Sequence, residues 1–148
     1  MASSAEEKGG IISSTKAERV ADDILAANEE ILAISIIDAR GGNVLASKPK
    51  ESFTKEFGVF QEGPRYGGSL ALSFLSIANE IREIAGETQS IITTYERCKG
   101  MLIPLPVYKV LVGLVLLKSV NAEDYDVSNK VERLFSKEEK EDEERRLG

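Results

Sequence analysis

The chain has 148 residues, of which 42% are apolar and 6% aromatic, and its net charge is −6. This length suits one domain with a single, mostly aliphatic core. The acidic balance argues against general nucleic-acid binding, because neutralising phosphates requires clustered Lys and Arg. The sequence contains no histidine and one cysteine, Cys98, so the commonest catalytic base and metal ligand is missing. We therefore expect no catalytic residue, no metal site and no cofactor.

Targeting and membrane signals are also weak. Residues 1–10 carry charged and small residues and lack the apolar segment of a secretory signal. A single thiol cannot form a disulfide within the chain, which fits a reducing compartment. The longest apolar stretch, 101–117, contains two prolines and a lysine and is shorter than the roughly 20 residues of a spanning helix. The prediction is a cytoplasmic protein with no membrane insertion.

The first elements form a helix and a hairpin. Residues 1–13 are small and polar and are predicted to be disordered. Thr15 and Glu18 have capping-box spacing, and apolar residues at the helical period predict a helix over 16–28, ended by Asn28. A β-branched run at 31–37 predicts a buried strand, and 44–47 returns antiparallel after a glycine-containing turn. In that turn Asp38 is expected to act as a cap.

The segment 48–68 concentrates aromatic residues. Phe53, Phe57 and Phe60 have helical spacing, so a short helix capped by Ser52 is predicted, and the glycine-rich 63–68, with Tyr66, closes the segment as a loop. Two alternatives remain open for these rings. They pack against the sheet, or they form an exposed apolar patch for a partner or an apolar ligand.

A long helix is predicted over 69–85, capped by Ser69 and stopped by Gly86. Leu72 and Leu75 widen its apolar surface beyond what one sheet face needs. Its main stripe is formed by Leu70, Phe74, Ile77, Ala78, Ile81, Ile84 and Ala85. The glycine pair before Ser69 allows an anion at a helix N-terminus, against the simpler interpretation of a flexible loop.

The last part of the chain predicts three strands and a helix. The strands lie at 88–96, 101–103 and 110–117, with a turn at 97–100 and a break at Pro104 and Pro106. Cys98 lies between Arg97 and Lys99, which could lower the pKa of its thiol, although an incidental turn cysteine is the simpler interpretation. A helix beginning near 121–126 buries Val127, Val131, Leu134 and Phe135. The domain is predicted to span 14–136, followed by a charged tail at 137–148 that is either a solvated helix or disordered.

The order helix, hairpin, helix, three strands, helix resembles the Roadblock and longin-like (profilin-like) superfamily. The likeness rests on Ile34-Ser35-Ile36-Ile37-Asp38-Ala39-Arg40-Gly41-Gly42-Asn43-Val44-Leu45-Ala46 and on Met101-Leu102-Ile103-Pro104-Leu105 followed by Val110–Leu116. The likeness covers about residues 16–136. The arrangement is also similar to that of small archaeal proteins with this architecture. It implies an α+β domain with one five-stranded antiparallel sheet flanked by helices. The 48–68 insertion is longer and more aromatic than the corresponding crossover of the family.

Two functions are open at this point. The first is a non-enzymatic regulatory scaffold that forms a homodimer, and the resemblance implies a small Ras-like GTPase or another regulatory protein as its partner. The second is a small-molecule sensor in which the 48–68 insertion acts as a lid. For a partner surface we predict Phe53, Phe57, Phe60, Tyr66, Leu72 and Leu75.

Overall fold

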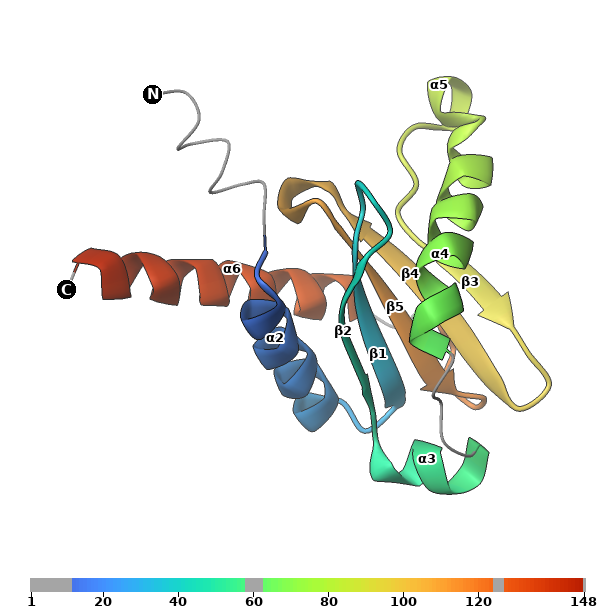
Figure 1. Ribbon diagram of the computed structural model, residues 1–148. Helices are drawn as coiled ribbons and strands as arrows, with labels where there is room; N and C mark the ends of the chain where they lie inside the picture. Colours follow the sequence, from blue (N-terminus) through green and yellow to red (C-terminus); the bar gives the residue numbers. More distant parts are fainter. Residues whose placement is uncertain (1–11, 58–62, 124–126, 148) are drawn as a thin grey trace.

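The protein forms one antiparallel sheet with helices against both faces (Figure 1). The computed structural model describes residues 12–57, 63–123 and 127–147. Within these ranges the strands are β1 (Ile31–Asp38), β2 (Val44–Pro49), β3 (Ile91–Thr94), β4 (Cys98–Leu105) and β5 (Val110–Leu117), in the spatial order β2-β1-β5-β4-β3. The helices are α2 (Ser14–Ala27), α3 (Glu51–Phe57), α4 (Gly63–Asn79), α5 (Arg82–Ala85) and α6 (Val127–Leu147). The predicted five-stranded α+β fold is confirmed.

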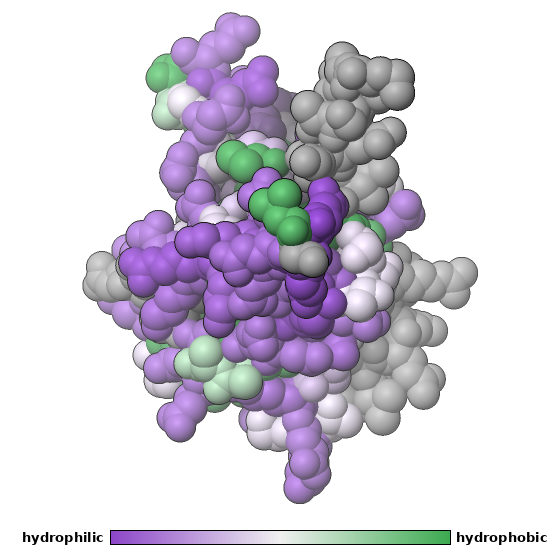
Figure 2. Space-filling view, turned by 90° about the vertical axis from the view of Figure 1, so that its left-hand side faces the viewer, coloured by the Kyte–Doolittle hydropathy of each residue, from purple (hydrophilic) through white to green (hydrophobic). Residues whose placement is uncertain are grey.

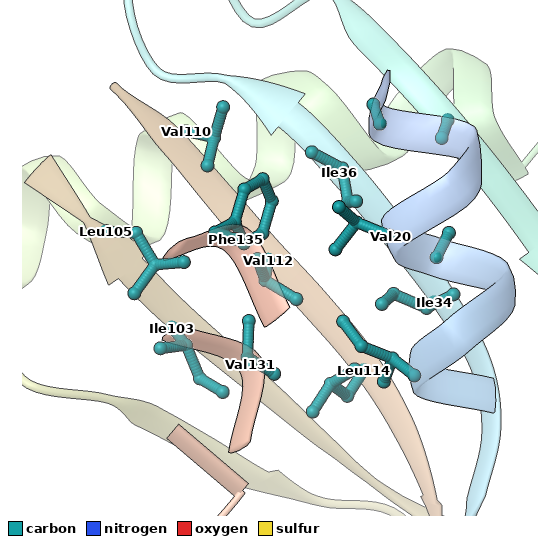
Figure 3. Packing of buried hydrophobic residues seen from close by; sticks show 14 of the residues in the cluster. Val20, Ile34, Ile36, Ile103, Leu105, Val110, Val112, Leu114, Val131 and Phe135 are labelled. Atoms are coloured by element: carbon teal, nitrogen blue, oxygen red, sulfur yellow. The ribbon is translucent and has the colours of Figure 1, made fainter. Parts of the chain in front are cut away.

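The main core lies between the sheet and the helices α2 and α6. Strand side chains alternate between the two faces of a sheet, and on this face β1 and β5 present large aliphatic residues, such as Ile34, Ile36 and Val112. Phe135 of α6 is fully buried over β4 and β5, and Val20 of α2 packs toward β1 (Figure 3). The Phe135 ring stacks on Tyr108 with centroids 5.1 Å apart. The predicted burial of Val131 and Phe135 is confirmed, whereas the side chain of Val127 lies outside the described residues.

Helix α6 continues well past the sheet and is tied to α2 by charges. The Arg19 guanidinium lies 3.3 Å from Glu138 Oε2 and 3.7 Å from Asp142 Oδ1, and Lys16 Nζ lies 3.5 Å from Asp142 Oδ2. Glu138 is buried, and its ion pair with Arg19 offsets the cost of its desolvation. Of the two alternatives for the charged run after residue 136, the structure shows the helix. The division into a domain at 14–136 and a tail stays a prediction.

The opposite face of the sheet has a much smaller core. Among the described residues, its buried members are Ile37, Ala71, Leu102 and Leu111. Leu72 and Leu75 of α4 pack against this group while remaining half-buried. Helix α4 therefore rests on one part of the sheet instead of covering it.

Several predicted boundaries are wrong, and the structure gives the reasons. Helix α2 is capped by Ser13, whose Oγ accepts a hydrogen bond from the Lys16 backbone N–H, in place of the predicted Thr15 box. Its end at Asn28 is confirmed. Helix α3 begins at Glu51, so Ser52 lies inside its first turn instead of capping it. Both helices begin one residue before the predicted cap, which places that cap inside the helix.

The glycine-rich segment 63–68 is helical, contrary to the predicted loop. Helix α4 begins at Gly63, and Pro64 in its first turn has the fixed φ that suits a helix start. Ser69 therefore lies inside the helix, and neither alternative for the glycine pair, a flexible loop or an anion at free helix amides, occurs there. The helix is interrupted after Asn79, α5 follows, and Gly86 (φ 89°) is the stop as predicted.

Strand β4 is longer than predicted and includes Pro104. The predicted turn at 97–100 is wrong, because pairing with β5 begins at Cys98. Pro104 is tolerated because the β3 ladder ends at Leu102, so β3 does not require its N–H. The break occurs at Pro106, in the 3-10 turn Pro106–Tyr108. Strand β3 is correspondingly shorter than the predicted 88–96.

We expect Phe135→Ala to lower the free energy of unfolding by about 3–5 kcal/mol, because it leaves a cavity in the main core. Urea denaturation followed by circular dichroism measures this change. Leu147→Ala in the same helix, where the side chain is 89% exposed, should change it by less than about 0.5 kcal/mol. Equal effects of the two substitutions would contradict the assigned packing.

Candidate interaction surface

Helix α4 exposes an apolar stripe with no charge on it. Between Tyr66 and Asn79 the sequence contains no charged residue at all. The solvent-facing positions of the helix are instead apolar or serine, whereas the exposed side of a helix in a soluble protein is normally charged. Beyond the end of α4 the exposed apolar residues continue with Ile81 and Ile84, which there lie among the exposed charged residues Glu80, Arg82 and Glu83. The apolar residues are Leu70 (53% exposed), Phe74 (41%), Ile77 (65%), Ile81 (60%) and Ile84 (91%). We call these five residues the α4 stripe.

The edge of the sheet lies on the same side of the molecule. Strand β3 is the last strand of the sheet beyond β4, so within the described residues no strand pairs with its outer backbone groups. In Figure 1, α4, α5 and β3 all lie to the right, away from α6. Tyr95, just after β3, is 51% exposed. An uncharged apolar helix face beside an open strand edge is typical of a surface that another chain covers.

The side of the molecule toward which α6 projects has the opposite character. Figure 2 shows that side to be almost wholly hydrophilic, with a few isolated apolar residues. Its helix α6 carries acidic and basic residues over most of its length. The clustering of exposed apolar residues at the α4 stripe is therefore not found on the side toward which α6 projects.

Residues predicted for partner binding fall into three groups. Phe53 in α3 is buried, and Leu72 and Leu75 are half-buried on the side of α4 that packs on the sheet. Phe57 and Tyr66 lie in α3 and α4, but their side chains are outside the described part of the structure, as is all of Phe60. Among the described side chains, Phe53, Leu72 and Leu75 are therefore at least half-buried, and the role of all six residues stays a prediction.

The sequence predicts the α4 stripe to be apolar but places it on the side facing the sheet, whereas the structure exposes it. The sequence predicts Leu72 and Leu75 as the surplus, whereas the structure packs them on the sheet and exposes Leu70, Phe74 and Ile77. The lack of charge from Tyr66 to Asn79 is a sequence signal that more than one face of this helix is apolar, but it does not show which face packs on the sheet. An amphipathic helix with one buried face would carry charges on the other.

A hollow lies between the sheet and the first half of α4. The registers place Ser47 opposite Ser35, Ser35 opposite Gly113, and Gly113 opposite Leu102. The next row toward the start of β1 runs through Pro49, Ala33, Val115, Gly100 and Thr93. Because the residues of the central strands are small here, space is left between the sheet and α4.

The hollow has a volume of about 560 Å³. Leu70, Ala71 and Phe74 of α4 form its roof, and Phe53 of α3 forms part of its wall. Among the described residues that line it, none is charged. Its polar side chains are Ser35, Ser47, Thr93 and Tyr95, and the Ser35 and Ser47 hydroxyl oxygens lie 3.3 Å apart.

Two polar residues outside these features, Asp38 and Cys98, do not form a reactive site. Asp38 acts as the predicted turn cap, because its carboxylate accepts hydrogen bonds from the backbone and side chain of Arg40. The same Arg40 side chain lowers the pKa of the Asp38 carboxyl. Burial raises the pKa of the Cys98 thiol, and this outweighs the opposing effect of Arg97 and Lys118. In the described ranges no group of His, Cys, Asp or Glu is placed to hold a metal ion, and no helix there is long and apolar enough to cross a membrane.

The fold is that of Roadblock/LC7 domains. A Roadblock/LC7 domain from Streptomyces avermitilis is 7% identical, with a TM-score of 0.58, over 88% of this chain and 98% of that one. The gliding protein MglB from Thermus thermophilus is 16% identical, with a TM-score of 0.63, over 86% and 91%. An MglB structure with a tetrameric arrangement is 18% identical, with a TM-score of 0.60, over 83% and 87%. No family model matches the sequence, and no curated protein does.

We expect Cys98 to be alkylated slowly, because only the thiolate reacts and burial raises the pKa of this thiol. The rate of iodoacetamide reaction, measured against pH, should show a midpoint above that of glutathione. The reaction of the unfolded protein in urea serves as the control and should match glutathione. A midpoint below that of glutathione in the folded protein would indicate an activated thiol.

Proposed function

We propose that the protein is a non-enzymatic regulatory scaffold that forms a homodimer through the α4 stripe and the β3 edge. The observation that carries this proposal is the uncharged, exposed α4 stripe. Covering it removes large apolar side chains from water, which is the main favourable term in protein association. The likeness in fold to an MglB that has a tetrameric arrangement supports assembly.

The edge strand gives the dimer a second set of contacts. Strands β3 of two copies can pair across a two-fold axis, because the same patch then meets itself. Pairing would satisfy the outer backbone groups of Ile91–Thr94 and extend the sheet across both copies. The helix and the strand edge lie on one side of the molecule (Figure 1), so a single contact can use both.

As the partner of this scaffold we propose a small Ras-like GTPase in the cytoplasm. This part rests on the resemblance to Roadblock domains together with the likeness in fold. The resemblance to archaeal proteins stays a prediction, since the three reported matches include proteins from Streptomyces and Thermus and do not test it.

The second candidate function is a small-molecule sensor, and the hollow under α4 is the observation that favours it. Helix α3, which belongs to the 48–68 insertion, supplies Phe53 to its wall. The proposed lid therefore contributes at least one side chain to the site. The two candidate sites meet at Leu70 and Phe74, which line the hollow and are also part of the exposed α4 stripe.

We expect the wild-type protein to sediment as a dimer at tens of micromolar and Ile77→Glu to sediment as a monomer. The reason is that a glutamate buried in the interface without a partner loses its hydration, which is costly. Leu147→Glu is the matched control, because it adds the same charge to an exposed leucine at the far end of α6 (Figure 1). Analytical ultracentrifugation measures all three. A wild-type monomer, or dissociation by both substitutions, would contradict the assigned interface.

For the partner, we expect affinity purification with the tagged wild-type protein to recover a small Ras-like GTPase from its native cell. Binding should then be reproduced with the two purified proteins and should differ between the GDP-bound and GTP-bound states. Measuring the same binding with Ile77→Glu shows whether the GTPase binds the dimer or a single copy of the protein. Failure of the purified pair to bind in either state would remove the GTPase from the proposal.

A further inference from the structure

We propose that the hollow under α4 binds an uncharged, mainly hydrocarbon small molecule that carries one hydroxyl or carbonyl group. This inference rests on the sensor function and names its class of ligand. The volume of the hollow, about 560 Å³, lies within the range of roughly 300–1,000 Å³ that is usual for small-molecule sites.

The floor of the site is built into the sheet. Gly113 lies in the central strand β5 with Ser35 on one side and Leu102 on the other. A Cβ built on Gly113 would have Ser35 O at 3.9 Å as its nearest atom, which is an ordinary contact. Backbone geometry therefore does not require glycine at position 113. The effect of the missing side chain is to leave space over the floor of the hollow.

The described lining offers no partner to a charged ligand group. Every described residue around the hollow is uncharged, and most are apolar. A carboxylate or ammonium group placed among them would lose its hydration without gaining a partner, which is costly. Hydrocarbon, by contrast, is stabilised when it is removed from water.

One polar group of the ligand has a defined partner. Ser35 and Ser47 face each other across β1 and β2 with their hydroxyl oxygens 3.3 Å apart. A hydroxyl has one proton to donate and two acceptor positions, so this contact uses one of the two protons. The second proton can be donated to a carbonyl or hydroxyl oxygen of the ligand, which fixes its orientation at the floor.

The test uses the neutral fluorescent probe N-phenyl-1-naphthylamine with the full chain. We expect saturable binding to the wild-type protein, and displacement by 1-decanol at concentrations at least tenfold lower than by decanoate or decyltrimethylammonium. Gly113→Val fills the hollow from its floor and should weaken probe binding at least tenfold. Gly41→Val makes the same substitution in the turn between β1 and β2 and should leave probe binding unchanged.

Three results would overturn the inference. Equal displacement by the neutral and charged competitors would show that the site does not select uncharged ligands. Unchanged probe binding in Gly113→Val, with a thermal unfolding midpoint showing that the variant folds, would place the probe on the α4 stripe. Binding to Ile77→Glu but not to the wild-type dimer would show that a second copy fills the hollow. The dimer is tested by sedimentation of the wild type and Ile77→Glu, and the ligand site is tested by probe binding to the same two proteins. A wrong dimer proposal and a wrong ligand proposal therefore give different results.

Discussion

The structure depends on the unequal size of the side chains on the two faces of the sheet. In β1 the residues Ile34 and Ile36 point to one face, and Ala33 and Ser35 to the other. In β5, Val112 and Leu114 point to the first face, and on the other face Gly113 leaves a gap between Leu111 and Val115. The large side chains hold α2 and α6 in a dense core (Figure 3). The small ones give α4 little to pack against, and the hollow and the exposed stripe both follow from this.

The dense core and the two proposed binding sites therefore lie on opposite faces of the sheet. The face with α2 and α6 contains most of the buried apolar residues, and its helices are joined further by Arg19 with Glu138 and Asp142. Among the described residues, the other face contributes the four buried members of the smaller core. Because the first face suffices to organise the strands, α4 can present apolar residues to a second molecule without the fold depending on them. Regions with few buried contacts are also those that open most easily.

Much of the fold could be predicted from the sequence, whereas the surface could not. The runs at 31–37 and 110–117 are β-branched and bounded by turn residues, so their strands followed from local pattern. Helix α4 is apolar on two adjacent faces, so its periodicity could not show whether Leu70 or Ala71 faces the sheet. The floor of the hollow depends on the pairing of Ser47, Ser35 and Gly113, and strand pairing is not a local property.

The two proposed sites share side chains, which links them energetically. Leu70 and Phe74 contribute to the roof of the hollow and are also 53% and 41% exposed in the α4 stripe. A ligand that moves either side chain changes the surface offered to a second copy. By thermodynamic linkage, assembly must then change the affinity for the ligand by the same factor. Since Phe74 is packed neither in the main core nor in the smaller one, it can take part in both contacts, and a scaffold of this construction can register a small molecule through its own assembly.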